Sequence, residues 1–194
     1  MSRAELLRDR VREAIDVCES LLEDDALAET FDRVVAEIVE SIRGGGKVML
    51  CGNGGSAADA QHLAAELVGR FCLERGAYPA LALSDNIAAV TAVGNDFGYV
   101  EVFARAVRGL GRPGDVLIGL STSGHSENVV RALAAARENG MVTVALVGMA
   151  GSPMEAASQY ALRVPGPSTA RIQEGQMLLG HAIIELVERE LCDV

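Results

Sequence analysis

Short apolar runs alternate with helical segments along the chain, and this alternation restricts the possible folds more than any other feature. Each run is bounded by glycine or polar turn formers, as is typical of buried strands. A repeated strand–helix order is characteristic of a parallel sheet covered by helices. We therefore expect one doubly wound α/β domain over residues 1–194. The expected strands are residues 48–51, 80–83, 116–120, 142–147 and 161–164.

Helical periodicity fills most of the intervals between these runs. Residues 94–98, Gly-Asn-Asp-Phe-Gly, are an exception, because turn formers dominate them and predict a loop. The last helix contains Gly175 and Gly180, each costing roughly 1 kcal/mol relative to alanine, which indicates close approach of another helix or a ligand. Helices are expected over residues 2–23, 26–43, 100–107, 127–138, 153–158 and 169–192, with one more beginning near residue 57 and one ending at residue 93.

The first helix has a narrow apolar stripe. One interpretation is a helix packed on its own domain. The other, which we prefer for a terminal segment, is a helix that contacts another subunit, so residues 1–25 are expected to form an oligomer contact. The stripe repeats at steps of four and three, as in a coiled coil, and consists of Leu7, Val11, Ala14, Cys18 and Leu21.

Composition and charge narrow the classes of function. The chain has 194 residues and is 49% hydrophobic, which suits one domain with a sizeable core. A net charge of -10, aromatics at 4% and the absence of tryptophan argue against a nucleic-acid or anionic membrane surface. The four cysteines show no CxxC spacing, so we expect reduced thiols in a cytoplasmic protein. The charged N-terminus is unlike a signal peptide, and no apolar run is long enough to span a bilayer.

A glycine-rich turn follows the first expected strand. Residues 52–56, Gly-Asn-Gly-Gly-Ser, lead into a helix whose backbone N–H groups and dipole favour an anion. Ser56 is expected to cap this helix. Further along the helix, His62 and Glu66 are four residues apart and share one face. They are candidates for an acid/base or metal-binding pair, and the alternative is a solvated surface pair.

A second anion site is expected after the strand at residues 116–120. Residues 121–126, Ser-Thr-Ser-Gly-His-Ser, place four hydroxyls before a helix but contain no Lys or Arg. Hydroxyl and backbone donors, aided by the helix dipole, can hold a phosphate without a basic residue. Capping alone is the plainer interpretation, yet four hydroxyls exceed what capping requires. Both loops follow strand ends, so they are expected to converge at the carboxyl edge of the sheet.

Two other histidines carry a weaker signal. His125 lies within the second loop and, taken alone, is expected to face solvent. His181 lies eight residues after Gln173 in the last helix, so both face broadly the same side across two turns. A single histidine in an apolar helix is usually a core residue, and the pattern alone does not decide between these readings.

Four spaced motifs occur in a fixed order: CGNGGSAADAQHLAAEL, GNDFG, GDVLIGLSTSGHSENV and RIQEGQMLLGH. With these residues the chain resembles the sugar isomerase (SIS) domain superfamily and, within it, the phosphoheptose isomerases. The resemblance extends from about Leu27 to the C-terminus. It implies a flavodoxin-like three-layer αβα sandwich with a five-stranded parallel sheet and N-terminal helices. It also implies a homotetramer whose active sites form between subunits.

The resemblance also implies roles for individual residues. Glu66 and His181 would form the acid/base pair. One zinc ion per subunit would bind His62, Glu66, Gln173 and His181. Substrate contacts are implied for Asn53, Gly54, Gly55, Glu66, Asn95, Asp96, Ser121, Thr122, Ser123, Ser126 and Gln173.

The implied activity is aldose–ketose isomerisation of sedoheptulose 7-phosphate to D-glycero-D-manno-heptose 7-phosphate through an enediol. Glutamate and histidine suit its proton transfers, and His/Glu/Gln/His donors are acceptable to zinc. Two alternatives stay open: a non-catalytic SIS-domain protein that binds sugar phosphates or regulates a replication initiator, and an isomerase of another sugar phosphate. Two departures from the family pattern bear on substrate choice and metal affinity. Ala170 stands where some members carry an acidic residue, and Gln176 replaces a histidine.

Overall fold

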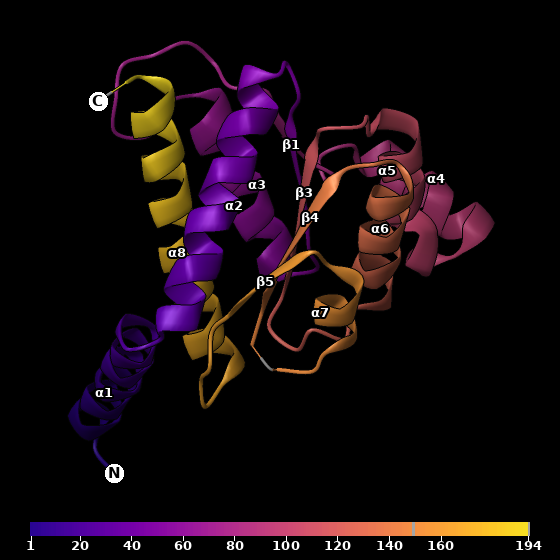
Figure 1. The fold of residues 1–194 in the computed structure, drawn as a ribbon. Coiled ribbons are helices and arrows are strands. Elements are labelled where there is room, and N and C mark those ends of the chain that lie inside the picture. The colour runs from indigo at the N-terminus through magenta and orange to yellow at the C-terminus, as the bar shows by residue number, and fades with distance from the viewer. Residues whose placement is uncertain (149, 194) are drawn as a thin grey trace.

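The structure is a computed structural model that describes residues 1–148 and 150–193. The strands are β1 (Val48–Cys51), β2 (Ala80–Ala82), β3 (Val116–Ser121), β4 (Val142–Val147) and β5 (Tyr160–Arg163). They form one sheet in the order β2-β1-β3-β4-β5, and every neighbouring pair is parallel (Figure 1). The predicted five-stranded parallel sheet is confirmed.

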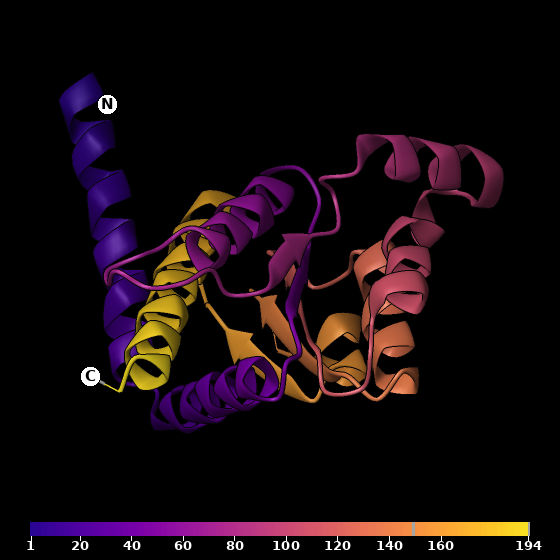
Figure 2. The ribbon, with the colours of Figure 1, turned by 90° about the horizontal axis from the view of Figure 1, so that it is seen from above.

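Helices cover both faces of this sheet and complete the three layers. They are α1 (Arg3–Leu22), α2 (Asp25–Arg43), α3 (Gly55–Val68), α4 (Ile87–Phe97), α5 (Val102–Leu110), α6 (Glu127–Glu138), α7 (Pro153–Ala157) and α8 (Thr169–Leu191), with a short 3-10 helix η1 (Tyr99–Glu101). Helices α2, α3 and α8 lie on one face, and α5, α6 and α7 lie on the other (Figure 2). Along β1, Val48 and Leu50 point into the first layer, whereas Met49 and Cys51 point into the second. Because both faces of such a strand are buried, its residues form a continuous apolar run in the sequence.

The prediction of a loop over residues 94–98 is wrong, because residues 94–97 form the last turn of α4. The Asn86 side chain starts this helix by accepting the N–H of Ala89 at 3.0 Å. Gly98 ends it with a φ of 87°, a left-handed conformation that favours glycine. Asn and Asp have low helix propensity, but the cost is only a fraction of a kcal/mol. The two caps therefore decide the length of the helix.

The prediction that Ser56 caps α3 is also wrong. The helix begins at Gly55, and the capping position is Gly54, with a φ of 56° and no side-chain cap. Ser56 lies in the first turn, and it is buried. Because the capping residue has no side chain, the turn presents backbone N–H groups at the start of α3.

Close approach of α8 to a neighbouring helix, predicted from its glycines, is confirmed. A Cβ atom at Gly180 would lie 2.8 Å from Cδ1 of Leu63 in α3. A Cβ atom at Gly175 would likewise overlap the side chain of Val164. The absence of a side chain at Gly180 brings together α3 and α8, the two helices that carry the expected zinc ligands.

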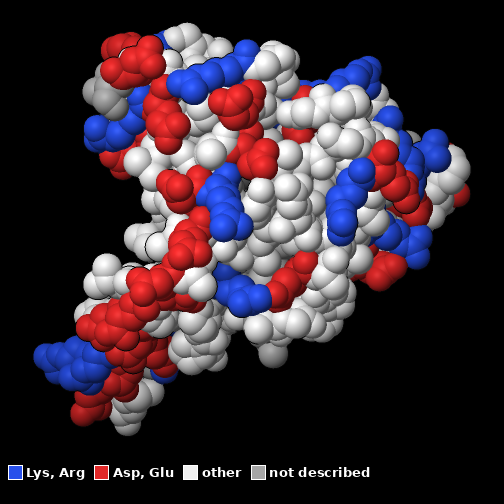
Figure 3. Space-filling model, viewed as in Figure 1, with Lys and Arg blue, Asp and Glu red and all other residues white. Residues whose placement is uncertain are grey.

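Helix α1 extends away from the sheet as an arm (Figure 1). Val17 is its one buried residue, whereas Leu7 and Val11 of the predicted stripe are 65% and 50% exposed and Cys18 is exposed as well. Acidic side chains gather along the same arm (Figure 3). The described part of the chain therefore covers little of the predicted apolar stripe.

Two further observations concern the whole chain. None of the described helices combines the length and apolar character needed to cross a membrane. All four cysteines are free thiols. Burial raises the pKa of the Cys51 thiol to about 12, so this residue behaves as a core side chain.

Candidate active site

The carboxyl ends of β1 and β3 form the switch point of the sheet. The chain continues from β1 to β2 on one side of this point and from β3 to β4 on the other, and ligands of such sheets bind in the crevice between. Residues 52–56, here called the glycine turn, follow β1, and residues 121–126, here called the serine loop, begin at the last residue of β3. The two expected anion sites are therefore adjacent.

Asn53 ties the glycine turn to the helix that follows the serine loop. Its side-chain amide and that of Asn128 in α6 exchange two hydrogen bonds, of 2.9 and 2.8 Å. The Tyr99 hydroxyl donates to Asn53 Oδ1 at 2.8 Å. The Asn53 side chain is thus engaged within the protein, and the turn offers a ligand its backbone at Gly54 and Gly55. Asn128 and Tyr99 escaped the sequence analysis because they lie 75 and 46 positions away, beyond any local pattern.

The hydroxyls of the serine loop bond to one another instead of capping α6. Ser121 Oγ lies 2.9 Å from Ser126 Oγ and 3.3 Å from Ser123 Oγ, and it accepts the N–H of Gly124 at 3.2 Å. Ser126 occupies the capping position but makes no side-chain cap. Thr122 is half-buried beside this cluster. Hydroxyls gathered at a helix N-terminus form a neutral set of donors suited to an anion.

Histidines from α3 and α8 meet across the contact between these helices. His62 Nε2 lies 2.9 Å from His181 Nε2, and the rings meet edge to face with centroids 5.1 Å apart. Glu66, one turn along α3, places Oε1 3.6 Å from His62 Nε2. The structure thus brings together three of the predicted residues, His62, Glu66 and His181, here called the histidine cluster, and its two histidines are 119 positions apart.

Gln173 reaches the same face of α3 but contacts a residue that the sequence analysis missed. Its Nε2 donates to Asp59 Oδ2 at 2.8 Å. Burial raises the pKa of Asp59, partly opposed by the Gln173 hydrogen bond and by His62. The signal was present in the sequence, because Asp59, His62 and Glu66 are spaced by three and four on one helical face.

The remaining predicted contacts lie apart from this cluster. Asn95 and Asp96 are exposed in the last turn of α4, where Asn95 Nδ2 donates to Asp96 Oδ1 at 2.8 Å. Among the described residues they make no other side-chain hydrogen bond. Gln176 of α8 is fully buried, and its Nε2 lies 3.5 Å from the Ser121 carbonyl oxygen. It therefore connects α8 to the serine loop.

The donor types in the histidine cluster suit zinc, although their arrangement is incomplete. Two imidazole nitrogens converge at 2.9 Å, and the Glu66 carboxylate is one turn away, a combination of N and O ligands that zinc accepts. Within the described ranges, however, no three His, Cys, Asp or Glu side chains are grouped as a metal site. Gln173 is bound to Asp59. Zinc binding therefore requires the side chains of Glu66 and Gln173 to turn.

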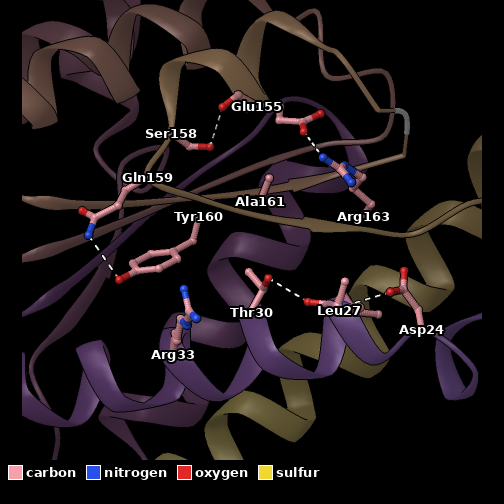
Figure 4. Close-up of a pocket in the computed structure, with 11 residues that line it drawn as sticks. Asp24, Leu27, Thr30, Arg33, Glu155, Ser158, Gln159, Tyr160, Ala161 and Arg163 are labelled. Carbon is pink, nitrogen blue, oxygen red and sulfur yellow. Dashed lines mark hydrogen bonds and ion pairs between the residues drawn. The ribbon is translucent and has the colours of Figure 1, made fainter.

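Two hollows in the surface bear on the location of the site. One, of about 500 Å³, opens on the outer side of α8 and is lined by Ala170, Gln173, Glu174, Met177, Leu178 and His181. The other, of about 420 Å³, lies between α2 and the edge strand β5 (Figure 4). Its charged groups are partly paired with each other, as in the Glu155–Arg163 ion pair. It contains none of the predicted site residues, so the first hollow belongs to the candidate site and the second does not.

Comparisons with known proteins agree with this architecture. A family model described as the SIS domain matches residues 11–148. A phosphoheptose isomerase of Rhodospirillum rubrum is 51% identical over 167 residues, 86% of this chain and 87% of the relative. One of Escherichia coli is 45% identical over 188 residues, 96% of this chain and 97% of the relative. The solved phosphoheptose isomerase of Neisseria gonorrhoeae superposes with a TM-score of 0.89 at 40% identity, over 96% of this chain and 99% of that one.

Proposed function

Because the chain belongs to the phosphoheptose isomerase family of SIS-domain proteins, we propose that it converts sedoheptulose 7-phosphate to D-glycero-D-manno-heptose 7-phosphate. The observation that carries the proposal is the meeting of His62, Glu66 and His181 between α3 and α8. This polar cluster joins a carboxylate and two imidazoles on α8 and on α3, the helix that follows the glycine turn.

Isomerisation of a ketose to an aldose moves one proton between C1 and C2 and one between the two oxygens. In the proposed mechanism Glu66 removes the proton from C1, which gives an enediol intermediate. Glu66 then returns the proton to C2. His181 exchanges a proton with the substrate oxygens. A carboxylate and an imidazole are suitable general acid/base groups for these steps.

The substrate's phosphate rests, in this proposal, on the serine loop. Ser121, Thr122, Ser123 and Ser126 would donate hydroxyl hydrogen bonds, and α6 would add its N-terminal amides and dipole. The backbone of Gly54 and Gly55, together with Asn53, Asn95, Asp96, Glu66 and Gln173, would contact the sugar.

We also propose that His62, Glu66, Gln173 and His181 hold one zinc ion per subunit. Zinc on such donors supplies a Lewis acid that polarises a carbonyl. The convergence of the two imidazole nitrogens supports the proposal. The residues themselves position the sugar and transfer its protons, as described above.

The proposed assembly is a cytoplasmic homotetramer with active sites between subunits. Its support is the arm formed by α1, whose apolar stripe is largely uncovered. In this proposal a second copy of the chain covers the stripe, as helices with such a seam pair in coiled coils. Light scattering coupled to size-exclusion chromatography measures the mass directly.

The experiment that tests the function is a reaction time course with a panel of ketose phosphates, followed by NMR of the aldose product. Sedoheptulose 7-phosphate should give the heptose 7-phosphate at a rate far above the rate without protein. Conversion of a shorter ketose phosphate alone would instead indicate an isomerase of another sugar. Binding of all of them without turnover would indicate a non-catalytic sugar-phosphate protein.

A further inference from the structure

Phe71 lies flat against the imidazole of His181. The two ring centroids are 5.4 Å apart and the ring planes differ by only 9°. His62 meets the same imidazole edge to face at 85°. His181 therefore contacts an aromatic face and a second imidazole, and these contacts restrict rotation of its ring.

Phe71 belongs to residues 69–76, here called the clamp loop, which follows α3 and passes over the C-terminal part of α8 (Figure 1). A loop without regular structure needs other partners for its backbone. Glu188 of α8 provides them, accepting the N–H groups of Phe71 at 3.0 Å, Cys72 at 2.6 Å and Leu73 at 2.8 Å.

Arg75 completes the clamp. Its Nε donates to Glu188 Oε1 at 2.8 Å, and the two side chains are 3% and 0% exposed. Its Nη2 donates to the Glu66 carbonyl at 2.8 Å, and its Nη1 donates to the Leu67 carbonyl at 2.9 Å. One buried ion pair thus joins the end of α3, the clamp loop and α8.

Stability alone is a weak explanation for this pair, because well-packed apolar groups often replace a buried ion pair without loss of stability. What an ion pair with directed hydrogen bonds provides is fixed geometry. Here the fixed geometry includes the position of Phe71. Glu188 lies two turns after His181 on the same helix, so the loop and the histidine are held to a common support.

We propose that Phe71 is a positioning residue for His181, held in place by the buried Arg75–Glu188 pair. This inference rests on the proposed function, in which His181 exchanges protons with the substrate. Phe71 acts by fixing the plane of the imidazole, so that one ring nitrogen faces the position of the substrate oxygens. Small displacements of a catalytic group are costly, and loss of the aromatic face should reduce turnover roughly tenfold.

The test compares Phe71→Leu and Phe71→Tyr with the parent enzyme. Phe71→Tyr keeps the aromatic face and should have the same kcat as the parent. Phe71→Leu should lower kcat about tenfold with little change in KM for sedoheptulose 7-phosphate. Phe31→Leu is the matched control, because Phe31 and Phe71 both pack partly buried against the same core. It should retain the parent's kcat.

NMR gives the second readout. The chain has 3 histidines, so the ring resonances of the zinc-loaded protein at one fixed pH can be assigned by the signal lost in His181→Gln. The His181 signal should be displaced by the Phe71 ring current and should move in Phe71→Leu but hardly in Phe31→Leu.

An unmoved His181 signal in Phe71→Leu overturns the inference. So does a moved signal with the parent's kcat, or an equal fall of kcat in Phe31→Leu. These outcomes presuppose an active parent. A parent that converts no sedoheptulose 7-phosphate overturns the proposed function itself, and the two failures are thereby distinguished.

Discussion

The histidine cluster and the serine loop are built in different ways. The cluster lies where two helices touch, and it joins titratable side chains, with two imidazole nitrogens 2.9 Å apart. The serine loop lies at the end of β3, and its hydroxyls bond to one another and to a backbone amide. Titratable groups can transfer protons at neutral pH, whereas hydroxyls and amides there mainly donate hydrogen bonds. The comparison separates chemistry from binding and predicts that substitutions in the two regions change different kinetic constants.

The largest effect should come from the cluster. Glu66→Gln and His181→Gln should each lower kcat by roughly 10²- to 10⁴-fold, because each removes one general acid or base. Steady-state kinetics with sedoheptulose 7-phosphate measures the loss. Glu185→Gln is a matched control, since Glu185 lies on α8 one turn beyond His181 and pairs with Arg189 at the surface. If both cluster variants turned over at the parent's rate, the cluster would not be the site of proton transfer.

Zinc content should also distinguish the histidine cluster from the serine loop. The parent should carry about one zinc per subunit after purification without chelator or metal affinity, and His62→Ala should carry little. The reason is that His62 carries one of the two converging imidazole nitrogens proposed to bind the metal. His125→Ala is the control, because His125 belongs to the serine loop and bonds to the Ser123 carbonyl. Elemental analysis decides, and equal zinc in both variants, or none in the parent, would contradict the proposed ligands.

A smaller effect, on KM, is expected in the serine loop. Ser121→Ala and Ser123→Ala should raise KM about tenfold, because a hydrogen bond to a charged group contributes roughly 1.5–3 kcal/mol. The change in kcat should be smaller, since the phosphate is remote from the reacting carbons. Ser158→Ala is the matched control in the other hollow, where Ser158 bonds to the Glu155 carbonyl. An unchanged KM in both serine-loop variants would indicate that the phosphate binds at the glycine turn instead.

The smallest expected effects concern the stability of the glycine turn. Asn128→Ala leaves the Asn53 amide without its buried partner and should lower the free energy of unfolding by about 1–3 kcal/mol. Tyr99→Phe removes one exposed hydrogen bond to the same residue and should cost about 0.5 kcal/mol. Urea unfolding measures both. An Asn128→Ala variant as stable as the parent would show that the reciprocal amide pair does not hold the two loops together.

The fold was predictable because strands buried on both faces leave continuous apolar runs, as in Val116–Leu120. Local exceptions arose where capping overrode composition. Gly98 set the end of α4 despite the turn formers Asn95 and Asp96, and Gly54 displaced Ser56 from the capping position.

The candidate site was predictable only in part. His62 and Glu66 share a helical face, a relation that spacing reveals. The contact of His62 with His181 depends on the packing of α3 against α8, and the Asn53–Asn128 pair depends on the order of strands. Neither contact leaves a local pattern. The hydrogen bonds from the N–H groups of residues 71–73 to Glu188 were equally unpredictable, because backbone groups carry no sequence signal.

The most direct test of the division between chemistry and binding is calorimetric titration of sedoheptulose 7-phosphate into two variants. His181→Gln should convert the substrate at least about 10²-fold more slowly than the parent. It should nevertheless bind the substrate at least about tenfold more tightly than Ser123→Ala, because only the latter loses a proposed phosphate contact. Ser123→Ala should still convert the sugar at saturating concentration. Weaker binding by His181→Gln than by Ser123→Ala, or loss of turnover in Ser123→Ala alone, would contradict the account.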